Sequence, residues 1–243
     1  MAWLTVAIPT MRRWTFLQEQ LPIFLARPEV AEVLVCDETG EDVAAAGASS
    51  WGNDPKLRLV VNPQRLGIYQ NKRRCIELAT SPMVAVLDSD NAFNDDWFET
   101  LADSVKKGGY GLIYASADFM TVDTTTGACI RPCAKWSGTR IQTSFEWNTF
   151  IDQPHFAHLT NDGNWVVPRD AALAALPHCT ASEQVLAMDA LYMLRCFVVA
   201  GIGLWYVPGL SYIHRVHPGS AWLETEKENL RIFKSTRWDI QVL

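Results

Sequence analysis

The sequence predicts one α/β domain with a mostly parallel central sheet and helices on both of its faces. Two observations lead to this fold class. Short apolar runs alternate with segments of helical spacing through the first hundred or so of the 243 residues, an alternation typical of parallel sheets. The run Met83–Leu87 is apolar at every position, as expected of a strand that is covered on both faces.

The first half of the chain is the more regular. Its apolar and β-branched runs predict strands at Leu4–Pro9, Glu32–Cys36, Leu57–Val61 and Met83–Leu87. Apolar residues at helical spacing predict helices at Trp14–Ala26 and Gly67–Ala79, the first of them interrupted by Pro22. The small-residue segment Ala44–Ser50 is expected to form a short helix or a loop.

The second half is less regular. Its apolar runs predict strands at Tyr110–Met120, Asn164–Pro168 and Gly203–Val207, and its helical spacing predicts helices at Arg169–Leu176, Ser182–Ala200 and Leu223–Thr236. Thr121–Gly127 is expected to be a turn. The polar and aromatic segment Trp136–Thr160 has no clear period.

The composition is that of an acidic globular protein. The net charge of −6 argues against nucleic acid as a general partner, because proteins that bind the phosphate backbone usually carry a basic face. The pair Cys129 and Cys133 has no further ligands to complete a zinc site, so reduced cysteines are the simpler explanation. No apolar stretch approaches the ~20 residues of a membrane span, and the N-terminal run lacks a basic leader. We therefore expect a cytoplasmic protein, either bacterial or viral and acting in the host cytosol.

The segment Asp88-Ser89-Asp90 directly follows the predicted strand Met83–Leu87 and is the strongest local motif. The carboxyl end of a parallel strand is where α/β folds place ligands. Paired carboxylates suit Mg²⁺ or Mn²⁺, and such an ion would let an acidic chain hold a diphosphate. The alternative is an ordinary Asp-Ser turn that caps the next helix.

Two further motifs lie after predicted strands. Asp37 could accept a hydrogen bond from a nucleobase or a ribose, or could belong to a simple Asp-Glu-Thr-Gly turn. Arg65, Gly67 and Lys72 lie around a helix start, which favours anions, and Gly67 lets the backbone approach a ligand closely. The alternative for this second motif is a solvated basic helix face.

Asp189 is the single acidic residue in the otherwise apolar segment 187–194. An aspartate is rarely buried without a partner, so it either pairs with a residue such as Arg195 or lines a site, where it could act as a general base. Further along, His214 and His217 follow a predicted strand. In an extended segment these two histidines point to opposite sides, so at most one would reach a given metal.

Several common nucleotide-binding and hydrolase motifs are absent from the sequence. There is no G-x-G-x-x-G after the first strand, no Walker A loop and no G-x-S-x-G elbow. A sugar nucleotidyltransferase would be expected to have a glycine-rich basic loop after the first strand, and Pro9–Arg13 contains no glycine.

Taken in order, these segments resemble the GT-A fold glycosyltransferases, in particular the family 2-like group. The opening strand Val6–Thr10 is similar to one that ends in Pro and Thr or Ser, and Cys36–Gly40 is similar to the family's D-D-G-S turn. Asn62, Gly67 and Lys72 then precede Leu87–Asp90, which looks like the D-x-D motif.

Two later segments complete the resemblance, which covers roughly residues 4–222. Met188-Asp189 followed by Arg195 resembles the family's E-D…R helix, and Arg215–Ser220 resembles its R-x-H-x-G-S segment. The sequence departs from the family pattern where Met188 replaces Glu and where Glu38 replaces the second Asp of the turn.

The resemblance implies a GT-A fold, that is, a Rossmann-like, mostly parallel central sheet flanked by helices in a single domain. We expect this domain over residues 1–222, with a nucleotide-binding half at 1–100, an acceptor-binding half at 101–222 and a helical tail at 223–243. The segment Trp136–Thr160 is then a candidate acceptor-binding loop. Trp97, Trp147 and Trp165 are candidates for stacking on sugar faces.

The resemblance also implies site residues and a reaction. The residues expected to bind the nucleotide sugar are Pro9, Thr10, Arg12, Asp37, Arg65, Gly67, Lys72, Asp88 and Ser89. The residues expected to bind Mn²⁺ or Mg²⁺ are Asp88, Asp90 and His217, with His214 as the fallback. Asp189 takes the place of the inverting catalytic base.

The expected reaction is metal-dependent transfer of a sugar from a nucleotide diphosphate donor, with UDP preferred, to a hydroxyl of a glycan or another acceptor. Three alternatives stay open on the sequence. They are a retaining GT-A enzyme without a dedicated base, a sugar nucleotidyltransferase, and a non-catalytic module that binds a sugar nucleotide or a glycan.

Overall fold

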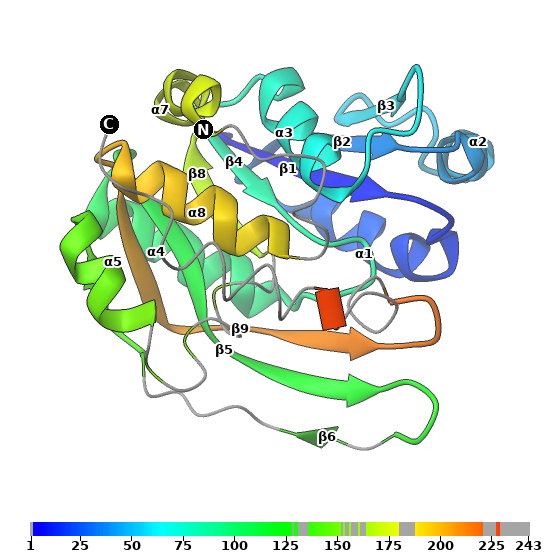
Figure 1. The fold of residues 1–243 in the computed structure, drawn as a ribbon. Coiled ribbons are helices and arrows are strands. Elements are labelled where there is room, and N and C mark those ends of the chain that lie inside the picture. Colours follow the sequence, from blue (N-terminus) through cyan, green and yellow to red (C-terminus); the bar gives the residue numbers. More distant parts are fainter. Residues whose placement is uncertain are drawn as a thin grey trace.

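The computed structural model describes residues 2–127, 129–130, 136–151, 153, 156, 160, 164–179, 188–220 and 227–228. In this part of the chain a central sheet carries helices on both faces (Figure 1). Apart from residues 227–228, which are helical, the predicted helix Leu223–Thr236 lies outside the described residues, and so do the side chains of Cys129 and Cys133. The structure confirms the predicted α/β fold class.

The described residues form a nine-stranded sheet with the order β3-β2-β1-β4-β8-β5-β9-β7, and β6 pairs with β5 outside this path. The first half of the chain supplies four parallel neighbours. These are β1 (Leu4–Thr10), β2 (Val30–Asp37), β3 (Leu57–Val61) and β4 (Met83–Val86). The prediction of a parallel sheet is confirmed for this half.

The second half of the sheet is mixed. β8 (Trp165–Pro168) is antiparallel to both of its neighbours, β4 and β5 (Leu112–Asp123). β5 runs parallel to β9 (Gly203–Val216), with short antiparallel strands β6 (Cys129–Ile130) on β5 and β7 (Arg140–Ile141) on β9. A single continuous sheet therefore joins the two halves of the domain.

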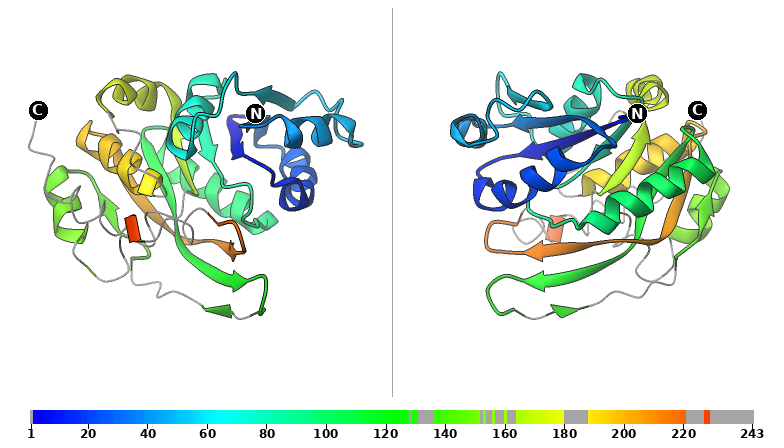
Figure 2. Two further views of the ribbon diagram at one scale, coloured as in Figure 1. Left: turned by 45° about the vertical axis from the view of Figure 1, so that its right-hand side comes forward. Right: turned by 180° about the vertical axis from the view of Figure 1, so that it is seen from behind.

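The helices divide between the two faces of the sheet, as Figures 1 and 2 show. One face carries α1 (Trp14–Ala26), α2 (Glu41–Ala48) and α4 (Asp95–Gly108). The other carries α3 (Ile68–Leu78), α5 (Ser144–Ile151), α7 (Arg169–Ala175) with the short 3-10 helix η1 (Leu176–His178), and α8 (Asp189–Val199).

The side-chain alternation of the central strands explains this three-layer arrangement. Along β1, Val6 and Ile8 belong to the core under α1 and α4, whereas Ala7 belongs to the core under α3 and α8. Successive side chains of a strand point to opposite faces, so a strand that is apolar at every position needs cover on both sides.

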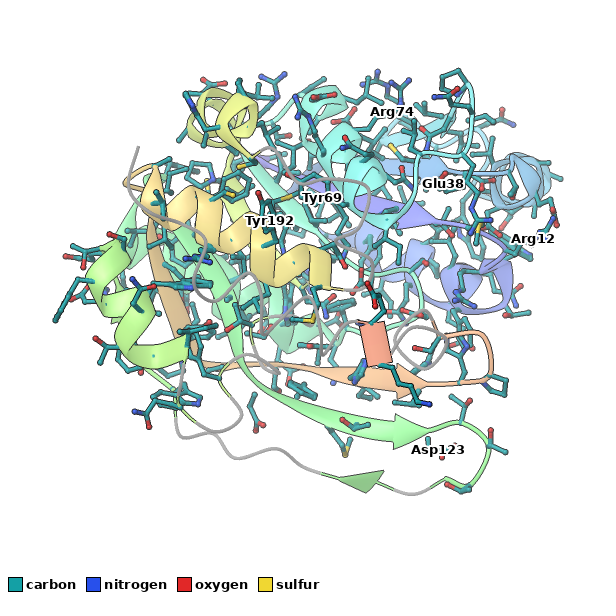
Figure 3. All side chains as sticks on the ribbon, viewed as in Figure 1. Arg12, Glu38, Tyr69, Arg74, Asp123 and Tyr192 are labelled. Atoms are coloured by element: carbon teal, nitrogen blue, oxygen red, sulfur yellow. The ribbon has the colours of Figure 1, made fainter. Side chains whose placement is uncertain are left out.

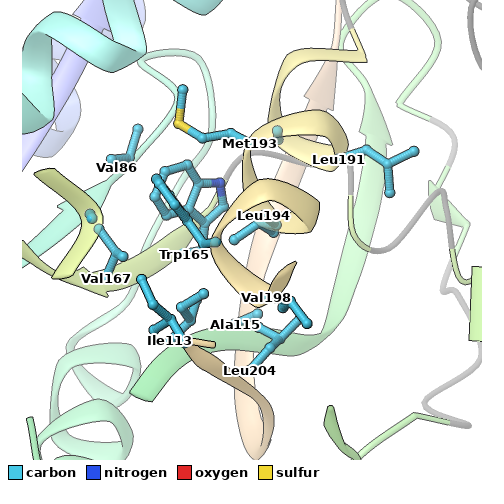
Figure 4. Close-up of a cluster of buried hydrophobic side chains, with 14 of the residues drawn as sticks. Val86, Ile113, Ala115, Trp165, Val167, Leu191, Met193, Leu194, Val198 and Leu204 are labelled. Atoms are coloured by element: carbon cyan, nitrogen blue, oxygen red, sulfur yellow. The ribbon is translucent and has the colours of Figure 1, made fainter. Parts of the chain in front are cut away.

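Three tryptophans that the sequence offered as sugar-stacking candidates belong to these cores. Trp97, Trp147 and Trp165 are each 1% exposed. Figure 4 shows Trp165 enclosed between the sheet and α8, next to Val86 and Leu194. The stacking hypothesis is wrong for all three in this structure, because a sugar face needs an accessible ring.

Two elements differ from the sequence prediction. The helix α4 was not predicted, although Trp97, Leu101 and Val105 all lie on its buried side. β9 was predicted to end at Val207 but continues to Val216, across a shift in its register with β5. Pro208 and Gly209 read as a strand end in the sequence, whereas the long pairing with β5 carries the strand past them.

The strand order of the sheet reverses at the carboxyl ends of β1 and β4. From β1 the chain moves outward through β2 to β3, and then crosses back to place β4 on the other side of β1. In open α/β sheets ligands bind where the strand order reverses in this way. Thr10 ends β1, and Asp88 lies two residues beyond the end of β4, so both belong to this edge.

The described residues include neither a membrane-spanning helix nor a disulfide. No helix among them is long and apolar enough to cross a membrane. Cys36, Cys75, Cys179 and Cys196 carry free thiols, in line with the expected reduced cysteines.

Trp97 packs against Phe93 and Phe98 in the core beneath α4. We expect Trp97→Ala to lower the free energy of unfolding by about 3–5 kcal/mol, because the substitution leaves a large cavity. Chemical denaturation measures this loss. The control is Phe145→Ala on α5, whose side chain is 80% exposed and which should change stability by less than ~0.5 kcal/mol. Equal losses in the two variants would contradict the core assignment.

Candidate active site

Polar side chains meet at the carboxyl edge of the four parallel strands. Thr10 and Asp37 are register partners at the ends of β1 and β2, and the segment Asp88–Asp90 follows β4. The start of α3 and the start of α8 reach the same place, because Lys72 of α3 contacts both Asp88 and Asp189. Residues from four distant parts of the sequence thus form one site.

Lys72 lies at the centre of this site. Its Nζ is 2.9 Å from Oδ1 of Asp88 and 2.8 Å from Oδ2 of Asp189. The Lys72 side chain is only 3% exposed and that of Asp189 only 5%. Burial disfavours the charged ammonium, but the two carboxylates, Asp189 and Asp88, outweigh this effect and raise the pKa of Lys72. Lys72 is therefore a cation shared by two acids.

The environment of Asp88 combines burial with one positive and two negative neighbours. Burial raises the pKa of the Asp88 carboxyl to about 7, opposed by Lys72 and supported by the negative charges of Asp90 and Asp189. Its backbone N–H donates to Oδ1 of Asn164, which precedes β8. The turn after β4 is thus held by two contacts, one with Asn164 just before β8 and one with Lys72 of α3.

Asp90 forms a second polar cluster with Arg13, which precedes α1, and His217, which follows β9. Its Oδ2 is 3.0 Å from Nε2 of His217 and 3.8 Å from Nε of Arg13. Burial opposes ionisation of Asp90, but the hydrogen bond from His217 and the charge of Arg13 lower its pKa. The hydrogen bond to Asp90 correspondingly raises the pKa of His217.

The structure separates the two histidines that the sequence left as alternatives. His217 follows β9 and contacts Asp90, whereas His214 lies within β9 and packs edge-on against Phe119. His217 is therefore the histidine that meets the D-x-D segment. His214 is held within the strand β9, whereas His217 lies beyond its end, in the segment that turns toward Asp90.

The segment after β9 is fastened to the D-x-D turn by further contacts. Arg13 donates from its guanidinium to the carbonyl of Gly219, and the backbone N–H of Arg215 donates to Oδ1 of Asn91. An isolated bridge pairs Ala92 with Ile213. The late R-x-H-x-G-S segment and the D-x-D motif, whose residues His217 and Asp90 are 127 positions apart in the sequence, thus lie next to one another at the site.

The remaining predicted donor residues surround the ends of β1 and β2. Pro9 and Thr10 end β1, and the Thr10 hydroxyl donates to Asp42 of α2. Asp37 is completely buried, and its two carboxylate oxygens accept backbone N–H groups of Thr39 and Val43. These contacts bind Asp37 to its own turn, so its role toward a nucleobase stays a prediction.

Arg12, Arg65 and Gly67 are at the surface of the same edge. Arg12 lies next to α2 at the outer edge of the molecule (Figure 3) and pairs with Glu41 at 2.8 Å, both side chains being exposed. Arg65 and Gly67 belong to the exposed loop before α3. Ser89 is buried within the D-x-D turn. The structure therefore brings the predicted donor residues to one edge, and their contacts with a donor stay predictions.

Four residues without a predicted role in the site also have contacts there: Arg13, Glu38, Asn91 and Asn164. Glu38 accepts from the backbone N–H of Leu66, and burial raises its pKa. Arg13 adjoins the predicted Arg12, and Asn91 directly follows the D-x-D motif, so proximity in sequence was the available signal for both. Nothing in the sequence marks Asn164, because its contact with Asp88 exists only through the pairing of β4 with β8.

Among the described residues, no group of three or more His, Cys, Asp or Glu side chains is arranged to hold a metal ion. The predicted set of Asp88, Asp90 and His217 is divided, because Asp88 pairs with Lys72 while Asp90 pairs with His217. Asp90 and His217 still fit a divalent ion. A carboxylate and an imidazole suit Mn²⁺, and 3.0 Å between their atoms is close to the separation of neighbouring ligands ~2.1 Å from an octahedral ion.

An acidic turn after a central strand, a buried lysine and an acid at a helix start lie around one topological switch point, and α/β folds bind ligands at such a point. The sequence profile of glycosyl transferase family 2 matches residues 5–164. The chain belongs to glycosyl transferase family 2, has the GT-A fold, and is a glycosyltransferase. A comparison with curated proteins gave no match.

Solved structures of glycosyltransferases share the fold along nearly the whole chain. S. aureus TarS 1–349 in complex with UDP-GlcNAc has a TM-score of 0.70 and 15% identity, over 100% of this chain and 68% of TarS 1–349. The mannosyltransferase PcManGT from Pyrobaculum calidifontis, in complex with GDP-Man and Mn²⁺, has a TM-score of 0.63 and 16% identity, over 99% and 65%. GalNAc-T7 with UDP, GalNAc and Mn²⁺ has a TM-score of 0.61 and 14% identity, over 96% and 48%.

Gly67 begins α3 with φ of +82° and ψ of 164°. We expect Gly67→Ala to cost about 1–3 kcal/mol of stability, because this backbone region is almost restricted to glycine. No atom lies within 4 Å of an added Cβ, so the loss would come from backbone strain and not from a steric clash. Urea unfolding measures the loss. The matched control is Gly111→Ala, where a Cβ also meets nothing and the backbone is ordinary. An equal effect at both positions would contradict the strain at Gly67.

Proposed function

We propose that the chain transfers a sugar from a UDP-linked donor to a hydroxyl acceptor, with inversion at the anomeric carbon and with Asp189 as the base. The single observation that carries this proposal is the meeting of Asp189 with the D-x-D aspartate Asp88 on one buried ammonium. This contact supports the proposal because it links the acid in the first turn of α8 to the aspartate expected to bind the donor.

In this mechanism the donor lies across the carboxyl ends of β1, β2 and β4. The diphosphate lies near Asp90, His217 and Arg13, where the guanidinium of Arg13 offsets part of its charge. Asp90 and His217 would hold Mn²⁺ or Mg²⁺, and Asp88 is a further candidate ligand or a ribose contact. When bound, the ion neutralises charge on the departing diphosphate as a Lewis acid.

Asp189 acts on the acceptor. Its carboxylate removes the proton of the attacking hydroxyl while the oxygen forms a bond to the anomeric carbon and the diphosphate leaves with the bonding electrons. Attack from the side opposite the diphosphate inverts the configuration. Asp189 suits this role because it is a buried acid whose ion-pair partner, Lys72, also contacts the donor-side Asp88.

A uracil nucleotide and a divalent ion are supported by the fold relatives. TarS is described with UDP-GlcNAc and GalNAc-T7 with UDP, whereas PcManGT is described with GDP-Man. Two of these structures contain Mn²⁺. A panel of nucleotide sugars with and without Mn²⁺, read by thermal stabilisation and by nucleoside diphosphate release, tests donor and metal together.

The same panel separates the alternatives. NMR of the product anomer distinguishes inverting from retaining transfer. A nucleotidyltransferase would instead release pyrophosphate from a nucleoside triphosphate and a sugar phosphate, and a non-catalytic module would be stabilised by a donor without turning it over. Membership of glycosyl transferase family 2 favours transfer over both.

We expect Asp189→Asn to lower kcat by about 10²- to 10⁴-fold, the usual contribution of general base catalysis, while stabilisation by UDP and Mn²⁺ persists. Steady-state kinetics of transfer measure this effect. The control is Asp170→Asn, an acid in the first turn of α7 whose side chain is 96% exposed, and its kcat should match the native value. Unchanged turnover in Asp189→Asn would exclude Asp189 as the base.

We expect His217→Ala to weaken Mn²⁺ affinity by about 10-fold or more, because losing even an outer-shell partner of a metal typically costs about 10- to 100-fold. Titration calorimetry of Mn²⁺ in the presence of UDP measures the affinity. His214→Ala is the matched control from the end of β9, and its affinity should stay within about 2-fold of native. Equal losses would contradict the assignment of His217 over His214.

A further inference from the structure

One side chain of the site has contacts that differ from those expected of a nucleotide-binding lysine. Lys72 extends from the second turn of α3 into the protein, where both of its ion-pair partners are carboxylates, Asp88 and Asp189. Asp88 belongs to the donor side and Asp189 to the acceptor side of the proposed reaction. Lys72 is the described residue that contacts both.

The burial of this triad makes its geometry specific. Lys72 and Asp189 are almost inaccessible, and Asp88 is 27% exposed. Ion pairs are stronger in such surroundings than at the surface, and removal of one partner leaves a buried charge without compensation. The ammonium therefore fixes where the two carboxylates lie relative to one another.

The backbone alone does not fix this relation. Asp88 follows β4 on a turn, and Asp189 is the first residue of α8. α3 packs against both β4 and α8, so a side chain of α3 is in the position to join them. The Lys72 stem crosses this packed region, and its burial limits the positions that the ammonium can take.

We propose that Lys72 is a positioning residue, which sets the placement of the base Asp189 relative to the donor-binding Asp88. The proposal rests on the proposed function, since it assumes that Asp189 is the base. It assigns to Lys72 a role through two other side chains rather than through contact with the nucleotide.

If Lys72 positions Asp189, replacing Lys72 should lower kcat, and this loss should occur only while the Asp189 carboxylate is present. A misplacement of about 1 Å at a reacting group can cost 10²-fold, so Lys72→Met is expected to lower kcat at saturating donor by ~100-fold. Lys72→Arg keeps the positive charge with a different shape, and we expect it to recover about 10-fold or more of the activity lost in Lys72→Met.

A double-mutant cycle tests the route of this effect. If Lys72 acts by placing the Asp189 carboxylate, Lys72→Met should lower kcat by less than ~3-fold in a protein that already carries Asp189→Asn, because residues that act as a unit are not additive. Losses that multiply in the double variant would overturn the positioning role. A purely structural lysine would produce that multiplicative result or no effect on kcat at all.

A matched control separates lost folding from lost positioning. Lys56 is a part-buried lysine away from the site, and its Nζ donates to the carbonyls of Leu25 and Arg27. Lys56→Met should lower the melting temperature without changing kcat of the folded protein. Circular dichroism checks each variant, and if Lys72→Met does not fold, the cycle is run with Lys72→Arg and the same criterion.

The outcomes distinguish this proposal from the proposed function. If the native protein transfers sugar but Asp189→Asn is fully active, the base assignment fails and the role of Lys72 fails with it. If Asp189→Asn is impaired and the losses multiply, only the role of Lys72 fails. Impaired Asp189→Asn with non-additive losses and partial recovery by Lys72→Arg supports both.

Discussion

The ammonium of Lys72 joins three elements that the chain assembles from positions far apart in sequence. Its contacts of 2.9 Å to Asp88 and 2.8 Å to Asp189 connect α3 with the end of β4 and the start of α8. An ammonium buried alone would be strongly disfavoured, and so would the neighbouring carboxylates. Each charge is tolerated only because the others are in place, so the site and the packing of α3, β4 and α8 depend on one another.

A second polar cluster joins other segments of the chain at the same site. Asp90, His217 and Arg13 bring together the D-x-D turn, the segment after β9 and the start of α1. This cluster holds two cationic or potentially cationic side chains around one acid, whereas the Lys72 cluster holds two acids around one cation. The division gives the edge of the sheet a cationic part near Arg13 and an acidic part near Asp189. In the proposed mechanism the first part faces the diphosphate, and the second accepts the proton of the attacking hydroxyl.

The architecture explains why these clusters meet. β1 lies between β2 and β4, so the strand order reverses beside it, and open α/β sheets bind ligands at the carboxyl ends of the strands at such a point. β8 and β5 extend the same sheet with antiparallel pairing, and β9 carries His217 back to the D-x-D turn. The family 2 profile ends at residue 164, yet Asp189 and His217 lie beyond it, so the described site draws on both the matched region and the segment after it.

The sequence by itself determined the α/β class and the parallel strands β1 to β4, because apolar periodicity and the runs before Asp37 and Asp88 are local properties of the chain. It also placed Asp189 and His217 as candidates through the order of the motifs. The tertiary structure decided what these residues contact: Lys72 bridges two acids, Asp90 selects His217 over His214, and Trp97, Trp147 and Trp165 are core rather than surface. These outcomes depend on strand order, helix packing and burial, which bring together residues that no local pattern relates to one another.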